Sequence, residues 1–237
     1  MSRRFKGVRI LNIQWAGTPN YTPGRQCRKI IAIVDHITAG LMPGCLSWMR
    51  NPAAKASAHY LITRAGVIYQ LVKEADTAWH AGEVKRPSWR LYDGTNPNRY
   101  TIGIEHEGKA GDALTEAQYQ ATLWLHRQLV QKYGIPADQD YIIGHYRIDS
   151  VNRPNCPGPG FPWGRLFADL KGGNGDMKVG MEIPEVKVTM QGKVAEKSVI
   201  LTVDGKDTTY IPAVVLREHG YRVDWDAATA SVTIKKG

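Results

Sequence analysis

Three residues of the kinds that bind metal ions lie far apart in the sequence, so only a folded domain can bring them together. His36 follows one apolar run (30–35) and His145 follows another (141–144), while Cys156 lies in a loop rich in proline and glycine. Two imidazoles and a thiolate are typical ligands of a catalytic zinc ion, which keeps one coordination position open for water. The alternative is that both histidines are ordinary hydrogen-bonded residues and Cys156 is a loop thiol.

The composition allows one ordinary domain and a small second one. The chain has 237 residues, 43% of them hydrophobic and 22% charged, as in a folded soluble protein. No apolar run approaches the roughly 20 residues that a membrane-spanning helix needs. The basic N-terminus is not followed by an apolar segment of signal-peptide length, so we expect synthesis in the cytoplasm without a signal peptide. We expect Cys27 and Cys45 to be reduced there, with one or both buried.

The basic charge of the chain points to an anionic partner. A net charge of +9 favours nucleic acid, anionic lipid or anionic wall polymers. The sequence has no zinc-finger spacing and no aromatic–basic strand motif, so we do not expect a nucleic-acid partner. The alternative is a charge surplus that serves solubility alone.

Residues 1–171 are expected to form an α/β domain with one central sheet. Two β-rich runs flank a glycine-containing turn at 64–66, which is typical of a hairpin. The clearest helix begins at Thr115, which makes a capping-box pattern with Gln118, and it ends at Gly134. Strands interleaved with helices favour a sheet flanked by helices. The expected strands are 30–35, 60–63, 67–71 and 101–107, and the expected helices are 43–50, 115–133 and 163–170.

A smaller module is expected after this domain. Residues 172–180 have the composition of a flexible linker, and 181–237 are expected to form a small, β-rich α+β module. Asp204–Gly205 is typical of a hairpin turn, and 212–219 fits one helix. The module has no cluster of metal ligands and no candidate nucleophile, so we expect wall binding or assembly from it. Its expected strands are 186–189, 198–203, 208–211, 221–224 and 231–234.

Two further positions have the chemistry of a catalytic cleft. Glu105 lies in a mostly apolar strand, where a carboxylate needs a partner or a function; beside a zinc-bound water it would act as general base. The alternative is a strand-end glutamate paired with an arginine. Trp79 offers a flat apolar face to a sugar or peptide and His80 a polar tip, although a packed aromatic and a surface histidine are the simpler interpretation.

The remaining histidines are weaker candidates. His106 alternates with Glu105 along its strand and is expected to point to the opposite face. His126 projects away from the apolar face of its helix and is expected in solvent, and His219 is expected at a helix end. His59, beside the hairpin, remains a candidate for substrate binding or for support of the site.

Taken together, these segments resemble the zinc-dependent N-acetylmuramoyl-L-alanine amidases of the bacteriophage-lysozyme and peptidoglycan-recognition-protein type. The likeness covers roughly residues 28–170. Five segments in order are far more specific than any one alone. The segments that carry the resemblance are 34–38, 57–66, 78–82, 102–105, and 144–145 continuing to 155–158.

The resemblance implies a central mixed sheet flanked by helices, with one Zn²⁺ in a surface groove. By position, His36, His145 and Cys156 would be the zinc ligands and Glu105 the catalytic carboxylate. The bond cut would be the amide between N-acetylmuramic acid and L-alanine in bacterial peptidoglycan. Trp79, His80 and His59 fall in the segments that would line the substrate groove.

Two positions depart from the family pattern. Some members have a catalytic tyrosine just before the hairpin histidine, where this chain has Ala58. Many have a lysine two residues before the last zinc ligand, where this chain has Pro154 next to Arg153. We expect Arg153 to take over oxyanion stabilisation, although a guanidinium differs from a point-charge ammonium.

The second module resembles the small stalk domain found at the N-termini of some copper amine oxidases, without any copper ligands. The biological setting we expect is a phage endolysin, made in the host cytoplasm, that lyses bacterial cells by acting on the wall after release. A cytosolic muropeptide-recycling amidase is the nearest alternative, and a non-catalytic peptidoglycan-recognition module is another. Self-association through the second module is a further expectation. The segments that carry the second resemblance are 203–206, 210–212, 220–221, 223–226 and 232–234.

Overall fold

A computed structural model describes residues 13–171 and five strand segments of the remaining chain: 188–189, 198–203, 207–212, 221–226 and 231–236. The chain divides into two compact units, residues 1–173 and 174–237. The linker expected at 172–180 lies outside the described residues. None of the described helices is long and apolar enough to cross a membrane.

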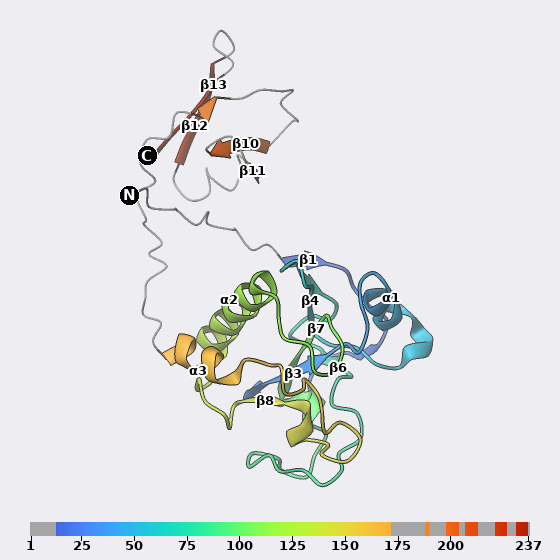
Figure 1. Cartoon of the computed structure of the whole chain (residues 1–237). Helices are drawn as coiled ribbons and strands as arrows, with labels where there is room; N and C mark the ends of the chain where they lie inside the picture. The colour runs from blue at the N-terminus through green and yellow to red at the C-terminus, as the bar shows by residue number, and fades with distance from the viewer. Residues whose placement is uncertain are drawn as a thin grey trace. The chain divides into compact units, whose positions relative to one another are not determined.

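The first unit is built on a six-stranded mixed sheet (Figure 1). Strands β4, β7, β3 and β8 run parallel to one another, and the hairpin β4–β5 supplies the antiparallel pair. The hairpin predicted from the sequence is therefore confirmed. In the order in which they lie side by side, the strands are β1 (Ile13–Trp15), β5 (Ile68–Gln70), β4 (Tyr60–Ile62), β7 (Thr101–His106), β3 (Ala32–Ile37) and β8 (Ile142–Gly144).

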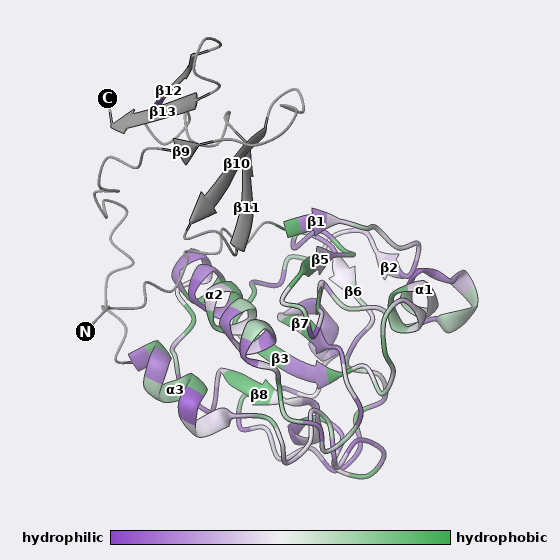
Figure 2. Cartoon of the chain, turned by 45° about the horizontal axis from the view of Figure 1, so that its top comes forward, coloured by the Kyte–Doolittle hydropathy of each residue, from purple (hydrophilic) through white to green (hydrophobic). Residues whose placement is uncertain are grey.

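Strand alternation divides the apolar side chains between two faces of this sheet. Ile33, Ile102 and Ile104 pack with residues of α2 (Glu116–Tyr133) and α3 (Trp163–Lys171) on one face. The other face contributes small and branched residues that are packed in two separate clusters, one of which includes residues of α1 (Gly44–Arg50). Figure 2 shows α2 alongside the sheet, and β8 is coloured as hydrophobic. The predicted mixed sheet flanked by helices is confirmed.

The long helix α2 begins and ends as its sequence predicts. Thr115 Oγ1 accepts a hydrogen bond from the backbone N–H of Gln118 (3.1 Å), and Gly134 closes the helix in the left-handed conformation. The Gln118 side chain does not complete a capping box. Its amide donates instead to the carbonyls of Ile62 and Glu107, and so ties the helix to strands β4 and β7.

Strand β3 extends further than the sequence predicts, because it includes His36. In the parallel pairing of β3 with β7, His36 lies directly opposite Glu105. Both residues are on the sheet face away from α2. Their neighbours Asp35 and His106 point to the α2 face, as alternation predicts for His106.

The prediction that His126 lies in solvent is wrong. The His126 side chain is fully buried, with Nε2 3.1 Å from Asp35 Oδ2 and Nδ1 2.8 Å from the carbonyl oxygen of Thr122. Carbonyl and carboxylate oxygens only accept, so with Asp35 ionised both ring nitrogens donate and the two side chains form a buried ion pair. The Asp35 carboxylate accordingly raises the pKa of His126 despite the opposing effect of burial.

The short helices and the minor sheet complete the first unit. Three 3₁₀ turns connect the main elements, and two short strands pair beside them. Cys27 is exposed and Cys45 is buried, and neither is in a disulfide. These elements are η1 (Pro52–Ala54), η2 (Pro97–Arg99), η3 (His145–Arg147), β2 (Tyr21–Thr22) and β6 (Thr77–Ala78).

The described part of the second unit consists of β-strands. β10 (Ser198–Val203) and β11 (Asp207–Pro212) form an antiparallel pair. β13 (Ser231–Lys236) pairs with β12 (Tyr221–Asp226) and β9 (Val188–Thr189). The residues of the helix expected at 212–219 lie outside the described residues, except for Pro212, which ends β11.

Removal of the His126 side chain is expected to destabilise the first unit strongly. In His126→Ala, Asp35 keeps its buried charge without its partner, which typically costs about 3–5 kcal/mol. Urea unfolding followed by near-UV circular dichroism measures the change. The control is Gln128→Ala, at an exposed position of the same helix, where a change below about 0.5 kcal/mol is expected. Equal unfolding midpoints for the two variants would contradict the ion pair.

Candidate metal centre

The structure brings His36, His145 and Cys156 together at the end of the parallel strands. His36 comes from β3, His145 from the start of η3 directly after β8, and Cys156 from the following loop. The Nδ1 atoms of the two histidines are 3.0 Å apart, and Cys156 Sγ is 3.9 Å from His36 Nδ1. One ligand atom from each residue lies within 4.8 Å of the others, and all three residues are buried.

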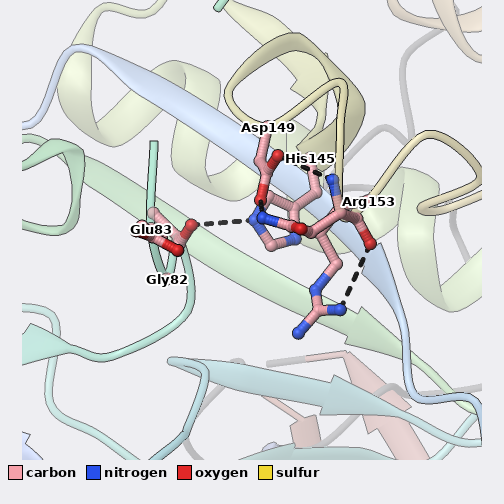
Figure 3. A pocket seen from close by; sticks show the side chains of 7 residues that line it. Gly82, Glu83, His145, Asp149 and Arg153 are labelled. Carbon is pink, nitrogen blue, oxygen red and sulfur yellow. Dashed lines mark hydrogen bonds between the residues drawn. The ribbon is translucent and has the colours of Figure 1, made fainter. Parts of the chain in front are cut away.

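Local contacts fix each of these side chains. His145 Nε2 is 2.9 Å from the carbonyl oxygen of Ala81 (Figure 3), so this nitrogen donates and Nδ1 keeps its lone pair. His36 Nε2 lies 3.1 Å from His80 Nδ1. The backbone N–H of Ile37 donates to Cys156 Sγ (3.4 Å). The three ligand atoms are therefore held in place by the fold itself.

The donor set and its spacing fit a zinc ion. Tetrahedral zinc with bonds of about 2.0 Å to nitrogen and 2.3 Å to sulfur sets two nitrogens about 3.3 Å apart and nitrogen and sulfur about 3.5 Å apart. The observed 3.0 Å and 3.9 Å are close to both values. Where neither Nδ1 carries a hydrogen, the two lone pairs face each other and repel, and a cation between them would relieve that contact.

Burial keeps these ligands uncharged. It lowers the pKa of His36 well below its ordinary value, with further lowering from His145 and His80, and it also lowers the pKa of His145. Burial raises the pKa of the Cys156 thiol to about 12. A thiol in such surroundings becomes a thiolate when a dication binds it, which couples metal binding to proton release.

Glu105 faces this centre from β7. Its Oε2 atom is shielded from solvent and has no hydrogen-bond partner among the described residues. Burial raises the pKa of Glu105 to about 8, against a lowering effect of the Arg153 guanidinium. A glutamate with one shielded, unpartnered carboxyl oxygen, beside a set of candidate metal ligands, has the surroundings of a general acid–base residue.

A cavity of about 820 Å³ opens onto the centre. Its wall includes the three ligands and Glu105, together with Trp79 and Lys55. A smaller pocket of about 330 Å³ shares Gly82, His145, Asn152 and Arg153 with the first (Figure 3). The volume and its mix of aromatic and charged walls suit a polar ligand larger than a single amino acid.

Arg153 is exposed and lines both cavities. Its guanidinium donates to the carbonyl oxygen of its neighbour Asn152 (3.3 Å), and no described carboxylate lies within ion-pair distance of it. The side chain is therefore available to an anionic group in the cavity. Pro154, at the departure from the family pattern, lines the larger cavity beside it.

The three predicted substrate-binding residues differ in their placement. Trp79 is half-buried on the cavity wall, and its indole N–H donates to Thr22 Oγ1 (2.9 Å). His80 reaches the wall but is only 7% exposed, with its ring between His36 and Thr101. His59 is fully buried and is not among the residues that line the cavity.

His59 instead supports the site from behind. Its Nδ1 accepts a hydrogen bond from the backbone N–H of Gly103 in β7 (3.0 Å), and its Nε2 lies 2.6 Å from Arg25. Arg25 is buried and donates to backbone carbonyls, among them that of Thr101 (3.1 Å). Burial lowers the pKa of His59 to about 3.

Sequence reasoning missed residues that hold the ligands in place. Asn98, in η2, accepts hydrogen bonds from the backbone N–H groups of His80 and Ala81, and Thr101 contacts the His80 ring. Neither residue has a distinctive local pattern. Their role depends on contacts across the fold, which no spacing in the sequence reveals.

Comparison with known proteins finds relatives over the first unit. Residues 26–159 match the family model described as N-acetylmuramoyl-L-alanine amidase. N-acetylmuramoyl-L-alanine amidase A of Achromobacter lyticus is 31% identical over 180 residues, which are 68% of this chain and 93% of that protein. The 1,6-anhydro-N-acetylmuramyl-L-alanine amidase AmpD of Salmonella typhimurium is 41% identical over 115 residues, which are 48% of this chain and 57% of AmpD.

A solved structure shares the fold. It is the complex of the N-acetylmuramyl-L-alanine amidase AmiD from E. coli with the substrate anhydro-N-acetylmuramic acid-L-Ala-D-gamma-Glu-L-Lys. The TM-score is 0.51 at 28% identity, over 64% of this chain and 58% of the AmiD chain. The match to AmpD and the match to AmiD thus each span little more than half of the relative.

The metal-free protein is expected to lose stability with rising pH because of Glu105. Its folded-state pKa of about 8 exceeds the ordinary 4.5, so between these values the unfolded chain releases a proton that the native state retains. Glu105→Gln removes this penalty. After chelation, the variant should be more stable than wild type by more than about 1 kcal/mol near pH 8.5, with the gap shrinking near pH 4. Glu116→Gln, on α2, is the control, and a gap independent of pH would contradict the shift.

Proposed function

The chain belongs to the N-acetylmuramoyl-L-alanine amidase family, and on that premise we propose that it is a zinc-dependent hydrolase of bacterial peptidoglycan. The bond cut is the amide between N-acetylmuramic acid and L-alanine. The observation that carries the proposal is the cluster of His36, His145 and Cys156. These three residues line a large cavity, and Glu105 lines the same cavity. This is three protein ligands with room for water, the arrangement of a catalytic zinc site.

Zinc, when bound, supplies a Lewis acid that polarises the scissile carbonyl and acidifies the attacking water. Glu105 takes the proton of that water at Oε2 and passes it to the leaving amine of L-alanine. A carboxyl group with a pKa near 8 is a poor base at neutral pH, but a dication nearby lowers its pKa and makes it available. The high proton affinity also suits the second half of its task, the protonation of the amine.

The remaining cavity residues bind and orient the substrate. Trp79 offers an aromatic face on the cavity wall, and Arg153 offers a guanidinium to a developing negative charge or to a carboxylate of the peptide. His80 acts on His36 rather than on the substrate. The AmiD complex, whose ligand is a muramyl peptide, supports a substrate of this chemical class.

Substitution of Glu105 is expected to abolish most activity while leaving the metal in place. Loss of a general base typically lowers the rate by about 10²- to 10⁴-fold. For Glu105→Gln we expect this loss in the release of free N-terminal alanine from purified peptidoglycan, with zinc content near that of wild type. Glu116→Gln is the matched control and should keep both.

The complementary variant is His36→Ala. It is expected to lose bound zinc as well as activity, because one of only three protein ligands is missing. Elemental analysis of the purified protein measures the zinc. Unchanged zinc content would exclude His36 as a ligand. Wall hydrolysis that is unaffected by a chelator would exclude the metal-dependent mechanism altogether, and no hydrolysis under any condition would favour a non-catalytic recognition module.

We further infer that the setting is the bacterial wall, as in a phage endolysin acting after release from the cell that makes it. Two features favour this: the chain has a second compact unit in addition to the first, and its net charge of +9 suits anionic wall polymers. The second candidate is the recycling of soluble muropeptides. The similarity to AmpD, a 1,6-anhydro-N-acetylmuramyl-L-alanine amidase, favours it.

Deletion of residues 172–237 separates the two settings. A wall-acting enzyme is expected to lose affinity in a wall co-sedimentation assay, since the second unit raises the local concentration of the first, while both chains cleave soluble muropeptides equally. A recycling enzyme is expected to bind walls weakly in both forms. Light scattering of the two chains measures the self-association that we propose for the second unit.

A further inference from the structure

Two adjacent residues, His80 and Ala81, contact both candidate imidazole ligands on the side away from the metal centre. Ala81 uses its carbonyl oxygen, which accepts from His145 Nε2 (2.9 Å). His80 uses its side chain, whose Nδ1 lies 3.1 Å from His36 Nε2. A carbonyl oxygen only accepts, so it fixes the tautomer of His145. An imidazole nitrogen either donates or accepts, so the tautomer of His36 depends on that of His80.

The direction of this contact is set by Thr101, at the start of β7. The Thr101 hydroxyl lies 2.7 Å from the carbonyl oxygen of Pro97, which only accepts, so the single hydroxyl hydrogen is donated there. The Thr101 oxygen is also 3.1 Å from His80 Nε2. Because its only hydroxyl hydrogen is donated to Pro97, the Thr101 oxygen accepts a hydrogen bond at this contact. His80 Nε2 therefore carries the ring hydrogen.

The tautomer of His80 in turn determines the tautomer of His36. The His80 ring is buried and no described carboxylate lies within ion-pair distance of it, so a charge on the ring would be unpaired, and the neutral ring has one hydrogen. Since that hydrogen is on Nε2, His80 Nδ1 accepts from His36 Nε2–H. His36 is then left with a bare lone pair on Nδ1, the atom 3.0 Å from His145 Nδ1. In the reverse arrangement a hydrogen on His36 Nδ1 would occupy the place of the metal.

The position of His80 is itself built into the fold. Asn98 Oδ1 accepts from the backbone N–H groups of His80 (3.0 Å) and Ala81 (2.7 Å), which fixes this pair of residues. The His80 ring packs against the bare backbone of Gly103 in β7. A Cβ atom at that position would lie 2.3 Å from His80 Cγ. All of these partners are buried or lie in the centre of the sheet.

We propose that Thr101 and His80 are positioning residues that fix the tautomer of His36 and thereby keep its Nδ1 free to bind a metal ion. This inference rests on the metal site of the proposed function and assigns it two residues that do not touch the metal. Removal of the Thr101 hydroxyl leaves His80 Nε2–H without a buried acceptor, so the opposite His80 tautomer becomes competitive. That tautomer donates to His36 Nε2 and puts the hydrogen on the ligand nitrogen.

The test compares Thr101→Val with Thr101→Ser. Valine has nearly the shape of threonine without the hydroxyl, whereas serine keeps it. We expect Thr101→Val to bind zinc about 10- to 100-fold more weakly than wild type, as is typical when a residue that orients a ligand is lost. Thr101→Ser should stay within about threefold of wild type. Competition with a chromophoric chelator measures the affinity in each full-length, refolded apoprotein.

A second measurement is independent of any variant. Long-range ¹H–¹⁵N correlation spectra of the wild-type apoprotein report which nitrogen of each histidine carries the hydrogen. His80 and His36 are both expected as Nε2–H tautomers. A hydrogen on Nδ1 of either ring would overturn the proposal, as would equal zinc affinity of the valine and serine variants. If wild type itself binds no zinc, the proposed function fails; if it binds zinc but the two variants do not differ, only the positioning role fails.

Discussion

The parallel register between β3 and β7 is the constraint on which the rest of the site depends. It sets His36 opposite Glu105 on one face of the sheet. Alternation then sends their neighbours Asp35 and His106 to the other face, against α2. A slip of one residue would exchange the two faces and carry the metal ligand into the core. The buried contact of Asp35 with His126 opposes such a slip, because a misplaced strand would leave both charges unpaired.

The same burial that stabilises the sheet prepares the centre for a cation. Around it the histidines are held neutral, the Cys156 thiol keeps its hydrogen, and Glu105 retains a proton at neutral pH. Each of these pKa shifts follows from burial away from water. A nearby cation would bind the neutral histidines and would lower the pKa values of Cys156 and Glu105. The metal-free site is thus uncharged, and the Glu105 Oε2 atom in it has no hydrogen-bond partner among the described residues.

The sequence predicts most of the fold, and the reasons are local. The hairpin, the start of α2 at Thr115 and the kinds of metal ligand follow from patterns within a few residues. The failures all concern polar residues whose partners are distant. His126 looks exposed by helical periodicity, yet its partner Asp35 lies on a strand far away in sequence. The sequence does not reveal Thr101 because the contact that gives it a role arises only when β7 and the segment that carries His80, after β6, are packed together.

The order of the three ligands along the chain has a consequence for biosynthesis. His36 belongs to a strand made early, whereas Cys156 comes from a loop close to the end of the first unit. A nascent polypeptide emerging from the ribosome therefore completes its binding site only after nearly all of the sheet is available for pairing. At the proposed metal site, zinc binding would therefore follow folding rather than nucleate it, and the growing chain would not offer a high-affinity zinc site before its scaffold exists.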